Sequence, residues 1–438
     1  MSDTIFALST APGRAGVAVV RVSGVGARIA LAALTGRSDF EPRHATRAPL
    51  RDVMGSPLDD ALVLWFPSPA SFTGEDIAEF HIHGGRAILD GLLAALYALP
   101  ALRPATAGEF TRRAVENGKL DLTRAEALAD LIDAETDSQR RQALRQYGGA
   151  LAALCDGWRD RLVRAAAWAE ASIDFADEEV PQGAITESRR DAATILDEIR
   201  AYLLDSHRGE IIRNGVHLTL FGNVNAGKSS LLNALAQRDV AIVSPIPGTT
   251  RDVIAVHLDL GGYAVIVSDT AGLRTTNDPV EAEGVRRARD QVDSSDITVL
   301  VLEGAVARPY DGIDPDLLKA ADLIVWNKSD VVGAGEGDAA LEISTRTGQG
   351  VDVLIKELAK IVQQRLEIAR DSPLLTRARH RHALEDAAAA LTRALPARDL
   401  ELMAEDFRLA LRALGRITGR VDIEDLLDVV FRDFCIGK

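Results

Sequence analysis

The strongest chemical signal in the chain is a glycine-rich segment, Gly222-Asn223-Val224-Asn225-Ala226-Gly227-Lys228-Ser229. It follows an apolar stretch at residues 216–221 and precedes a helical pattern at residues 231–235, which is the context that a P-loop requires. The glycines let backbone N–H groups reach phosphates without a Cβ clash, and the helix N-terminus adds partial positive charge. We expect Lys228 to contact the phosphates and the hydroxyl of Ser229 to bind Mg2+. The predicted phosphate contacts are Asn225, Ala226, Gly227, Lys228, Ser229 and Ser230.

Two motifs that could sense the γ-phosphate follow in the order found in GTPases. Thr249 and Thr250 offer hydroxyls that can reach Mg2+ and the γ-phosphate. Asp269 closes an apolar strand and can hold Mg2+ through water, and Gly272 can donate its N–H to the γ-phosphate. The predicted contacts in these two segments are Ser244, Pro245, Ile246, Pro247, Gly248, Thr249, Thr250, Asp269, Thr270, Ala271 and Gly272.

Two further motifs indicate that the base is guanine. Asn327-Lys328-Ser329-Asp330 ends an apolar strand, and the Asp330 carboxylate can accept hydrogen bonds from N1–H and the 2-amino group of guanine. Adenine lacks this pair of donors, so a site built around the carboxylate would reject it. Ser344-Thr345-Arg346 follows a short strand and can close over the base. Together the motifs predict a GTP-binding domain and disfavour a kinase or an ATPase.

The residues that would catalyse hydrolysis are only partly evident. Leu273 stands where Ras-type enzymes place a water-orienting glutamine. Glu281 is the first carboxylate that could polarise water from this segment, although an exposed glutamate at a helix start explains it equally well. No arginine finger can be assigned, and such a residue contributes about 10³ to 10⁵ in rate. A monovalent cation could replace it, because Asn225 and the loop at residues 244–249 offer hard oxygen ligands that suit K+. Lys228 and Thr250 complete the predicted catalytic set.

The elements that would position these residues fall into three parts. Residues 1–117 mix predicted strands (16–22, 61–66, 77–82) with predicted helices (26–34, 86–99), which indicates an α+β domain. Helical periodicity dominates residues 118–214, with a break at Gly148-Gly149, a loop at 177–183 and a helix at about 187–206. It returns in residues 371–438. We therefore expect an all-helical domain that is interrupted by a P-loop GTPase domain with a mostly parallel sheet, residues 215–370.

Composition limits the remaining possibilities. The 438 residues carry a net charge of −15, which argues against strong bulk binding of nucleic acid. Two cysteines, no run of 18 apolar residues and no signal-peptide pattern lead us to expect a cytoplasmic protein without a membrane span. His81 and His83 could be two metal ligands, but no third ligand is evident, and hydrogen bonding beside the Gly84-Gly85 turn is the simpler interpretation.

Several motifs spread along the chain resemble those of the MnmE (TrmE) family of tRNA-modification GTPases. The resemblance covers the whole sequence. The motifs are Ala11-Pro12-Gly13-Arg14-Ala15-Gly16, Val20-Arg21-Val22-Ser23-Gly24, Ser71-Phe72-Thr73-Gly74-Glu75-Asp76, Gly108-Glu109-Phe110-Thr111, Lys119-Leu120-Asp121-Leu122, Asn225-Ala226-Gly227-Lys228-Ser229-Ser230, Gly248-Thr249-Thr250-Arg251-Asp252 and Phe434-Cys435-Ile436-Gly437-Lys438.

The resemblance implies a function with a partner. It implies an N-terminal tetrahydrofolate-binding domain through which the chain forms a homodimer, a helical domain and an inserted G domain. With the FAD-dependent protein MnmG, in a heterotetramer, the enzyme would add an aminomethyl or carboxymethylaminomethyl group at the 5 position of the wobble uridine of certain tRNAs. The one-carbon unit would come from 5-formyl- or 5,10-methylene-tetrahydrofolate. Hydrolysis of GTP would accompany transient pairing of the G domains, promoted by K+.

The resemblance also assigns residues. A carboxylate suits the amino-pyrimidine edge of a pterin and cations suit a glutamate tail. The implied folate contacts are Arg21, Glu79, Lys119 and Lys438; the K+ ligands are Asn225, Ser244, Ile246 (through its carbonyl) and Thr249; the Mg2+ ligands are Ser229 and Thr250; and the water-activating residue is Glu281. Val224, Ser244 and Thr345-Arg346 depart from the family pattern.

Two questions stay open in the sequence. The first is whether the chain performs modification chemistry or is a regulatory or ribosome-assembly GTPase, a switch without such chemistry. The terminal motif and the implied folate contacts favour modification. The second is whether Cys435 is a nucleophile or an inert thiol.

Overall fold

The computed structural model describes residues 3–174, 183–223, 225–242, 255–269, 289–304, 310, 313–331, 341–366, 375–421, 427, 431 and 437. The chain divides into two compact units. One unit combines residues 1–129, 146–196 and 383–438, and the other combines residues 130–145 and 197–382. Among the described helices, none has both the length and the apolar character needed to cross a bilayer.

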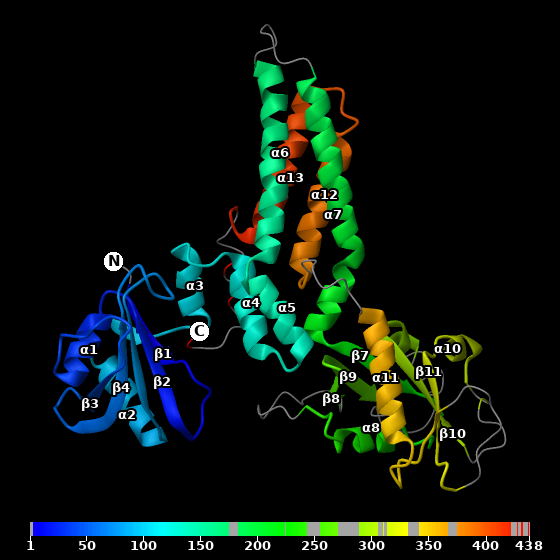
Figure 1. The fold of residues 1–438 in the computed structure, drawn as a ribbon, viewed down its shortest axis with the longest axis horizontal. Helices are drawn as coiled ribbons and strands as arrows, with labels where there is room; N and C mark the ends of the chain where they lie inside the picture. The colour runs from blue at the N-terminus through cyan, green and yellow to red at the C-terminus, as the bar shows by residue number, and fades with distance from the viewer. Residues whose placement is uncertain are drawn as a thin grey trace, which may run out of the picture. The chain divides into compact units, whose positions relative to one another are not determined.

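The N-terminal domain is a mixed sheet with two helices on one face (Figure 1). The sheet order is β3-β4-β5-β2-β1-β6, and every neighbouring pair is antiparallel except β1 with β6. Its elements are β1 (Thr4–Leu8), β2 (Ala15–Ser23), α1 (Ala27–Thr35), β3 (Thr46–Arg51), β4 (Pro57–Phe66), β5 (Ile77–Gly84), α2 (Arg86–Tyr97) and β6 (Leu102–Pro104).

Strand alternation divides this sheet into an apolar face and a polar face. Val20 and Val22 of β2 point into the core with Phe80 of β5, and α1 and α2 cover that core. Side chains alternate along a strand, so the residues between them point to the opposite face. Arg21 and Glu79 are therefore neighbours on the opposite face, where β2 and β5 pair them directly.

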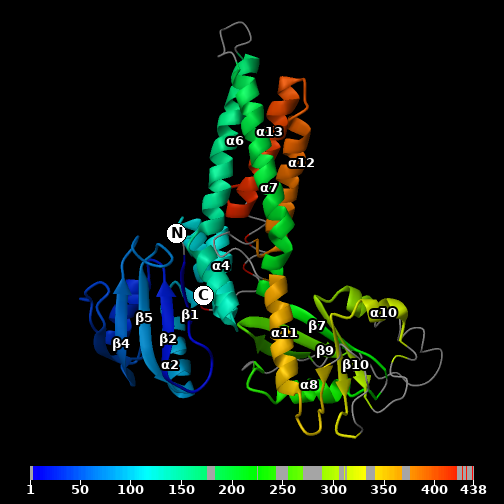
Figure 2. The same ribbon diagram turned by 45° about the vertical axis from the view of Figure 1, so that its right-hand side comes forward.

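The helices before and after the nucleotide-binding segment pack on each other. Figures 1 and 2 show α6, α12 and α13 running alongside one another, and the buried Trp158 and Phe407 belong to this packing. The predicted helical domain, made of helices before and after the inserted segment, is confirmed. The helical elements are α3 (Glu109–Glu116), α4 (Leu122–Asp133), α5 (Asp137–Tyr147), α6 (Ala150–Asp174), α7 (Ala184–Asn214), α12 (Ala378–Ala394) and α13 (Leu400–Thr418).

Two details of the predicted secondary structure need correction. Helix α7 continues to Asn214, well beyond the predicted end near residue 206, because a mixed pattern of charges does not stop a helix whose apolar side is buried. Helix α3 and the strands β1, β3 and β6 have no counterpart among the predicted elements. The predicted break at Gly148-Gly149 is confirmed, since α5 ends and α6 begins there and Gly149 has a φ of 89°.

The inserted domain has a six-stranded sheet with helices on both faces. Its order is β12-β11-β10-β7-β9-β8, and only β8 is antiparallel to its neighbour, which confirms a mostly parallel sheet. Helices α8 and α11 cover one face, and α10 covers the other. The elements are β7 (Val216–Phe221), α8 (Lys228–Ala236), β8 (Ala255–Leu260), β9 (Tyr263–Asp269), β10 (Ile297–Glu303), α10 (Pro315–Lys319), β11 (Leu323–Asn327), β12 (Leu341–Glu342) and α11 (Val351–Leu366).

Helix α5 belongs to the same compact unit as the nucleotide-binding domain. The backbone N–H of Ser138 donates to the carbonyl of Gly262, 3.0 Å away, in the turn between β8 and β9. The side chain of Gln139 donates to the carbonyl of Arg213 at 3.1 Å. This turn is therefore held against the start of α5.

Candidate functional site

The loop between β7 and α8 has the backbone geometry of a phosphate-binding loop. Gly222 has a φ of 139°, and a Cβ there would lie 2.1 Å from the carbonyl oxygen of Val301. Gly227, with a φ of 93°, precedes the first residue of α8, and a Cβ there would lie 2.1 Å from Nδ2 of Asn327. Both positions exclude larger residues, so the two glycines of the motif are structural requirements of this loop.

The lysine of the motif lies across the loop. Lys228 is only 6% exposed, and its ammonium group donates to the carbonyls of Gly222 at 2.8 Å and Asn223 at 2.9 Å. Ser229 and Ser230 follow in the first turn of α8, where helix N–H groups favour an anion. The structure thus gathers a cation, a helix N-terminus and hydroxyls at one strand end.

The predicted guanine contacts are assembled next to this loop. Asn327, at the end of β11 and 1% exposed, donates to the carbonyl of Ala226 at 3.0 Å and accepts from the N–H of Thr345 at 3.2 Å. One buried amide therefore joins the phosphate loop to the segment that follows β12. Lys328 has a φ of 65°, and its ammonium group lies 2.8 Å from Glu303, a partner that the sequence did not indicate.

The carboxylate predicted to recognise guanine, Asp330, is ionised and is held in place by two side chains of the segment that follows β12. Asp330 accepts a hydrogen bond from the hydroxyl of Ser344 at 2.7 Å, and Arg346 lies 3.6 Å from its other oxygen. The Ser344 hydrogen bond and the Arg346 charge hold the pKa of Asp330 below its usual value. An ionised carboxylate is an acceptor only, as recognition of the guanine edge requires.

Several predicted residues lie outside the described part of the chain. The backbone of Asp269 ends β9, but its side chain is not described. Of the implied K+ ligands, only Asn225 is described, in a left-handed conformation with a φ of 66°. The remaining predicted residues outside the description are Ser244, Pro245, Ile246, Pro247, Gly248, Thr249, Thr250, Thr270, Ala271, Gly272, Glu281, Cys435 and Lys438.

On the polar face of the N-terminal sheet, two of the implied folate contacts meet. Arg21 donates to Glu79 at 2.9–3.0 Å, and the two side chains are 22% and 16% exposed. His81 is hydrogen-bonded to the other carboxylate oxygen of Glu79 at 3.2 Å. Burial tends to raise the pKa of Glu79, but the His81 hydrogen bond and the Arg21 charge outweigh it and lower the pKa. Arg21 and Glu79 thus form a partly buried, ionised pair.

Two aromatic rings complete this site, and sequence reasoning assigned them no role. The Arg21 guanidinium lies 5.5 Å from the ring centre of Phe72 and 5.8 Å from that of Phe110, within the range of cation–π attraction. The resemblance had singled out the two short motifs that contain these rings. The motifs did not indicate that the rings of Phe72 and Phe110 contact Arg21, because that contact depends on the fold.

Of the other two implied contacts, Lys119 is described, and Lys438 lies outside the described residues although Gly437 before it is described. Lys119 donates to the carbonyl of Pro69, at 2.8 Å, in the loop that carries Phe72. Gly437 precedes Lys438, and its carbonyl accepts from the Ser9 hydroxyl at 3.0 Å, just beyond β1. Strand β1 is the neighbour of Arg21 in the sheet.

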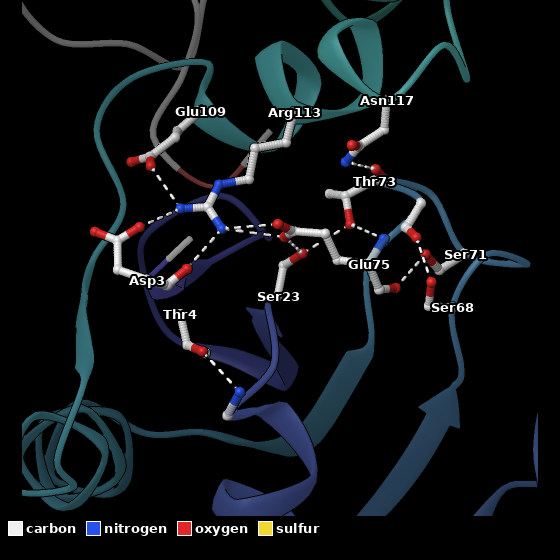
Figure 3. A network of polar contacts seen from close by, with 12 residues as sticks. Asp3, Thr4, Ser23, Ser68, Ser71, Thr73, Glu75, Glu109, Arg113 and Asn117 are labelled. Atoms are coloured by element: carbon white, nitrogen blue, oxygen red, sulfur yellow. Dashed lines mark hydrogen bonds and ion pairs between the residues drawn. The ribbon is translucent and has the colours of Figure 1, made fainter. Parts of the chain in front are cut away.

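A cluster of charges surrounds Arg113 of α3 beside the same loop (Figure 3). Arg113 donates to Asp3, Glu75 and Glu109 at 2.8–3.2 Å. Burial raises the pKa of Glu109, but hydrogen bonds from Arg103, the backbone N–H of Thr106 and Arg113 lower it to about 2. Glu109 is therefore ionised at neutral pH.

The two histidines considered as metal ligands bind carboxylates instead of each other. His83 lies 2.8 Å from Asp59, and His81 contacts Glu79. Within the described residues, no group of three or more potential metal ligands occurs. The hydrogen-bonded interpretation accounts for both side chains.

Comparisons with known proteins agree with this architecture. The family described as GTP-binding protein TrmE N-terminus matches residues 4–119, and the MnmE helical domain family matches residues 122–435. The chain is 56% identical over 441 residues to the tRNA modification GTPase MnmE of Parvibaculum lavamentivorans, and 54% identical over 444 residues to that of Paramagnetospirillum magneticum. Each alignment covers 100% of both proteins. The chain therefore belongs to the MnmE (TrmE) family of tRNA-modification GTPases.

Proposed function

We propose that this GTP-hydrolysing enzyme of tRNA modification works with the FAD-dependent protein MnmG in a heterotetramer. Its product would be an aminomethyl or carboxymethylaminomethyl group at the 5 position of the wobble uridine of certain tRNAs. A tetrahydrofolate derivative, 5-formyl- or 5,10-methylene-, would supply the one-carbon unit. We further propose a cytoplasmic homodimer formed through the N-terminal domain, residues 1–117.

The observation that carries the folate proposal is the Arg21–Glu79 pair beside two aromatic rings. Glu79 is ionised, so it can accept hydrogen bonds from the amino-pyrimidine edge of a pterin. Phe72, which is partly buried, offers flat apolar surface beside Arg21, and the fully buried ring of Phe110 packs in the cluster that supports Phe72. Lys119, and Lys438 beyond Gly437, would meet the carboxylates of a glutamate tail.

The residues proposed to bind and hydrolyse GTP lie at the ends of strands β7 and β11 and in the loops that follow them. Lys228 and the first turn of α8 bind the phosphates, and Asp330 recognises guanine. Mg2+ would be held by Ser229 and Thr250, and it would neutralise charge that develops on the phosphates. K+ would be held by oxygens of Asn225, Ser244, Ile246 and Thr249 and would supply the positive charge of a missing arginine finger. We propose that Glu281 orients the attacking water, and that the G domains pair transiently during hydrolysis.

Calorimetry tests the folate proposal directly. The full chain should bind 5-formyltetrahydrofolate, and Arg21→Ala or deletion of Lys438 should each weaken binding by about tenfold or more, because each removes a charged hydrogen-bond donor. GTP hydrolysis serves as the control for folding. A chain that binds no folate would leave the alternative of a regulatory or ribosome-assembly switch.

The cation proposal has its own test. Replacing K+ by Na+ at constant ionic strength should slow GTP hydrolysis, since the smaller ion fits the same oxygens poorly. Equal rates in the two salts would remove K+ from the mechanism.

A further inference from the structure

The loop that carries Phe72 is held in place by side chains that do not themselves reach Arg21. It comprises residues 67–76 and joins β4 to β5. A loop of this length has many conformations unless its backbone groups are bonded. The position of Phe72 against Arg21 therefore depends on whatever fixes this loop.

Four hydrogen bonds fix its middle (Figure 3). The hydroxyl of Ser23, on β2, donates to Glu75 at 2.7 Å and lies 2.7 Å from the hydroxyl of Thr73. The N–H of Glu75 donates to the Thr73 hydroxyl at 3.2 Å. The side chain of Asn117, just after α3, donates to the carbonyl of Thr73 at 2.7 Å.

One ion pair connects this loop to α3. Arg113 donates to both carboxylate oxygens of Glu75, at 3.1 and 3.2 Å, and the side chains of Arg113 and Glu75 are only 9% and 15% exposed. Helix α3 also carries Phe110, the second ring beside Arg21. The Arg113–Glu75 pair therefore ties together the two elements that supply the aromatic rings.

Arg103 shows what a purely stabilising arginine in the same cluster looks like. It contacts Glu109 and Asp3, as Arg113 does, and its side chain is 41% exposed. Its described partners do not include Glu75 or any residue of the loop. The two arginines thus share acidic partners but differ in their connection to Phe72.

We propose that Arg113 and Glu75 are positioning residues of the ligand site. They hold residues 67–76 so that Phe72 forms one wall for the flat ring of a pterin-class ligand whose polar edge meets Glu79. Phe72 touches the ligand, whereas Arg113 and Glu75 act only through the loop. This inference rests on the folate function proposed above.

The test compares matched substitutions in the full chain by calorimetry with 5-formyltetrahydrofolate and by thermal unfolding. Arg113→Lys and Glu75→Gln should each weaken binding by about tenfold, because they remove or weaken the ion pair between the loop and α3 and leave the Asn117 hydrogen bond as the remaining tie. Arg103→Lys should lower Tm as Arg113→Lys does, but change Kd by less than about twofold. Phe72→Leu should weaken binding and Phe72→Tyr should retain it, since only the second keeps the ring.

Two outcomes would overturn the inference. One is wild-type affinity in both Arg113→Lys and Glu75→Gln; the other is an equal loss in Arg103→Lys and Arg113→Lys, which would indicate general destabilisation. The Arg21→Ala variant separates this from failure of the folate function itself. If Arg21→Ala also binds normally, the proposed site is wrong; if only Arg21→Ala loses binding, the site stands and the positioning role falls. A cooperative thermal unfolding transition in each variant confirms that the N-terminal domain has folded, and wild-type GTP hydrolysis confirms the same for the nucleotide-binding domain.

Discussion

The nucleotide site and the N-terminal polar site are constructed in different ways. The nucleotide site is made of short loops at strand ends, and its shape depends mainly on backbone groups and on glycine conformations. Asp330 and its partner Ser344 are 14 residues apart, and Asn327, from the same short motif as Asp330, joins this segment to the phosphate loop 101 residues away. The N-terminal site is made of side chains on strand and helix faces that are far apart in sequence. Arg21 and Glu79 are 58 residues apart, and Arg113 and Asp3 are 110 apart.

Because of this difference, we expect substitutions to reduce ligand affinity in different ways at the two sites. A backbone loop tolerates no Cβ at its close contacts, so one methyl group should abolish its function. A site of interlocked charges loses affinity by degrees, because the remaining partners still hold most of the geometry. The substitutions below test this contrast, and they are ordered by the size of the expected effect.

Gly222→Ala should have the largest effect. The new methyl group would meet the Val301 carbonyl at a φ of 139°, so the loop must distort and GTP affinity should fall by about 100-fold or more. Titration with a fluorescent, non-hydrolysable GTP analogue measures the change. The control is Gly262→Ala, which also has a positive φ but whose Cβ would meet nothing closer than 4.0 Å. Equal losses in the two variants would show that backbone strain alone, rather than the close contact, governs the loop.

Asp330→Asn should follow. It removes the charge that accepts the guanine donors, while Ser344 can still bond to the remaining oxygen. A hydrogen bond to a charged group contributes about 1.5–3 kcal/mol, so GTP affinity should fall by roughly 10- to 150-fold. Competition binding with ATP measures discrimination as well as affinity. Unchanged preference for GTP would mean that another group reads the base.

Gly437→Ala should affect the N-terminal site alone, by about tenfold in folate affinity. A Cβ at this position would lie 2.0 Å from the Leu8 carbonyl, and the φ of 100° is unfavourable for alanine. The segment that bears Lys438 must therefore move. Calorimetry should show weaker folate binding, whereas the rate of GTP hydrolysis should be unchanged. A parallel loss of turnover would contradict the separation of the two sites.

The last prediction concerns acid stability rather than ligand binding. The pKa of Glu109 is about 2 in the folded chain and 4.5 ordinarily, so its ionised form stabilises the fold above about pH 4.5, and this stabilisation is lost as pH falls through 2. The contribution is at most about 3 kcal/mol. The Tm values of wild type and Glu109→Gln should differ at pH 7 and converge between pH 5 and pH 2. Glu116→Gln, an exposed change in the same helix, should leave Tm almost unaltered throughout.

The sequence allowed the first site to be predicted in far more detail than the second. Strand β7, the phosphate loop and the segments at Asn327 and Ser344 have local patterns, and the structure places the described ones together. The Arg113–Glu75 pair has no local pattern, because its members meet only after α3 folds onto the sheet. Strands β3 and β6 were missed for a related reason. They are edge strands, and each contains a proline and arginine, which weakens the apolar alternation on which strand prediction depends.

The hydrogen bond between Ser138 and Gly262 joins the start of α5 to the hairpin formed by β8 and β9. The turn at Gly262 lies midway on one continuous peptide, with β8 leading back toward Thr250 and β9 leading forward to Asp269. Thr250 is expected to reach Mg2+ and the γ-phosphate, and Asp269 is expected to hold Mg2+ through water, so both strands of this hairpin lead to the predicted site of hydrolysis. The hydrogen bond from Ser138 fixes the tip of this hairpin to the first turn of α5, so the hairpin is anchored at the end opposite the predicted site of hydrolysis.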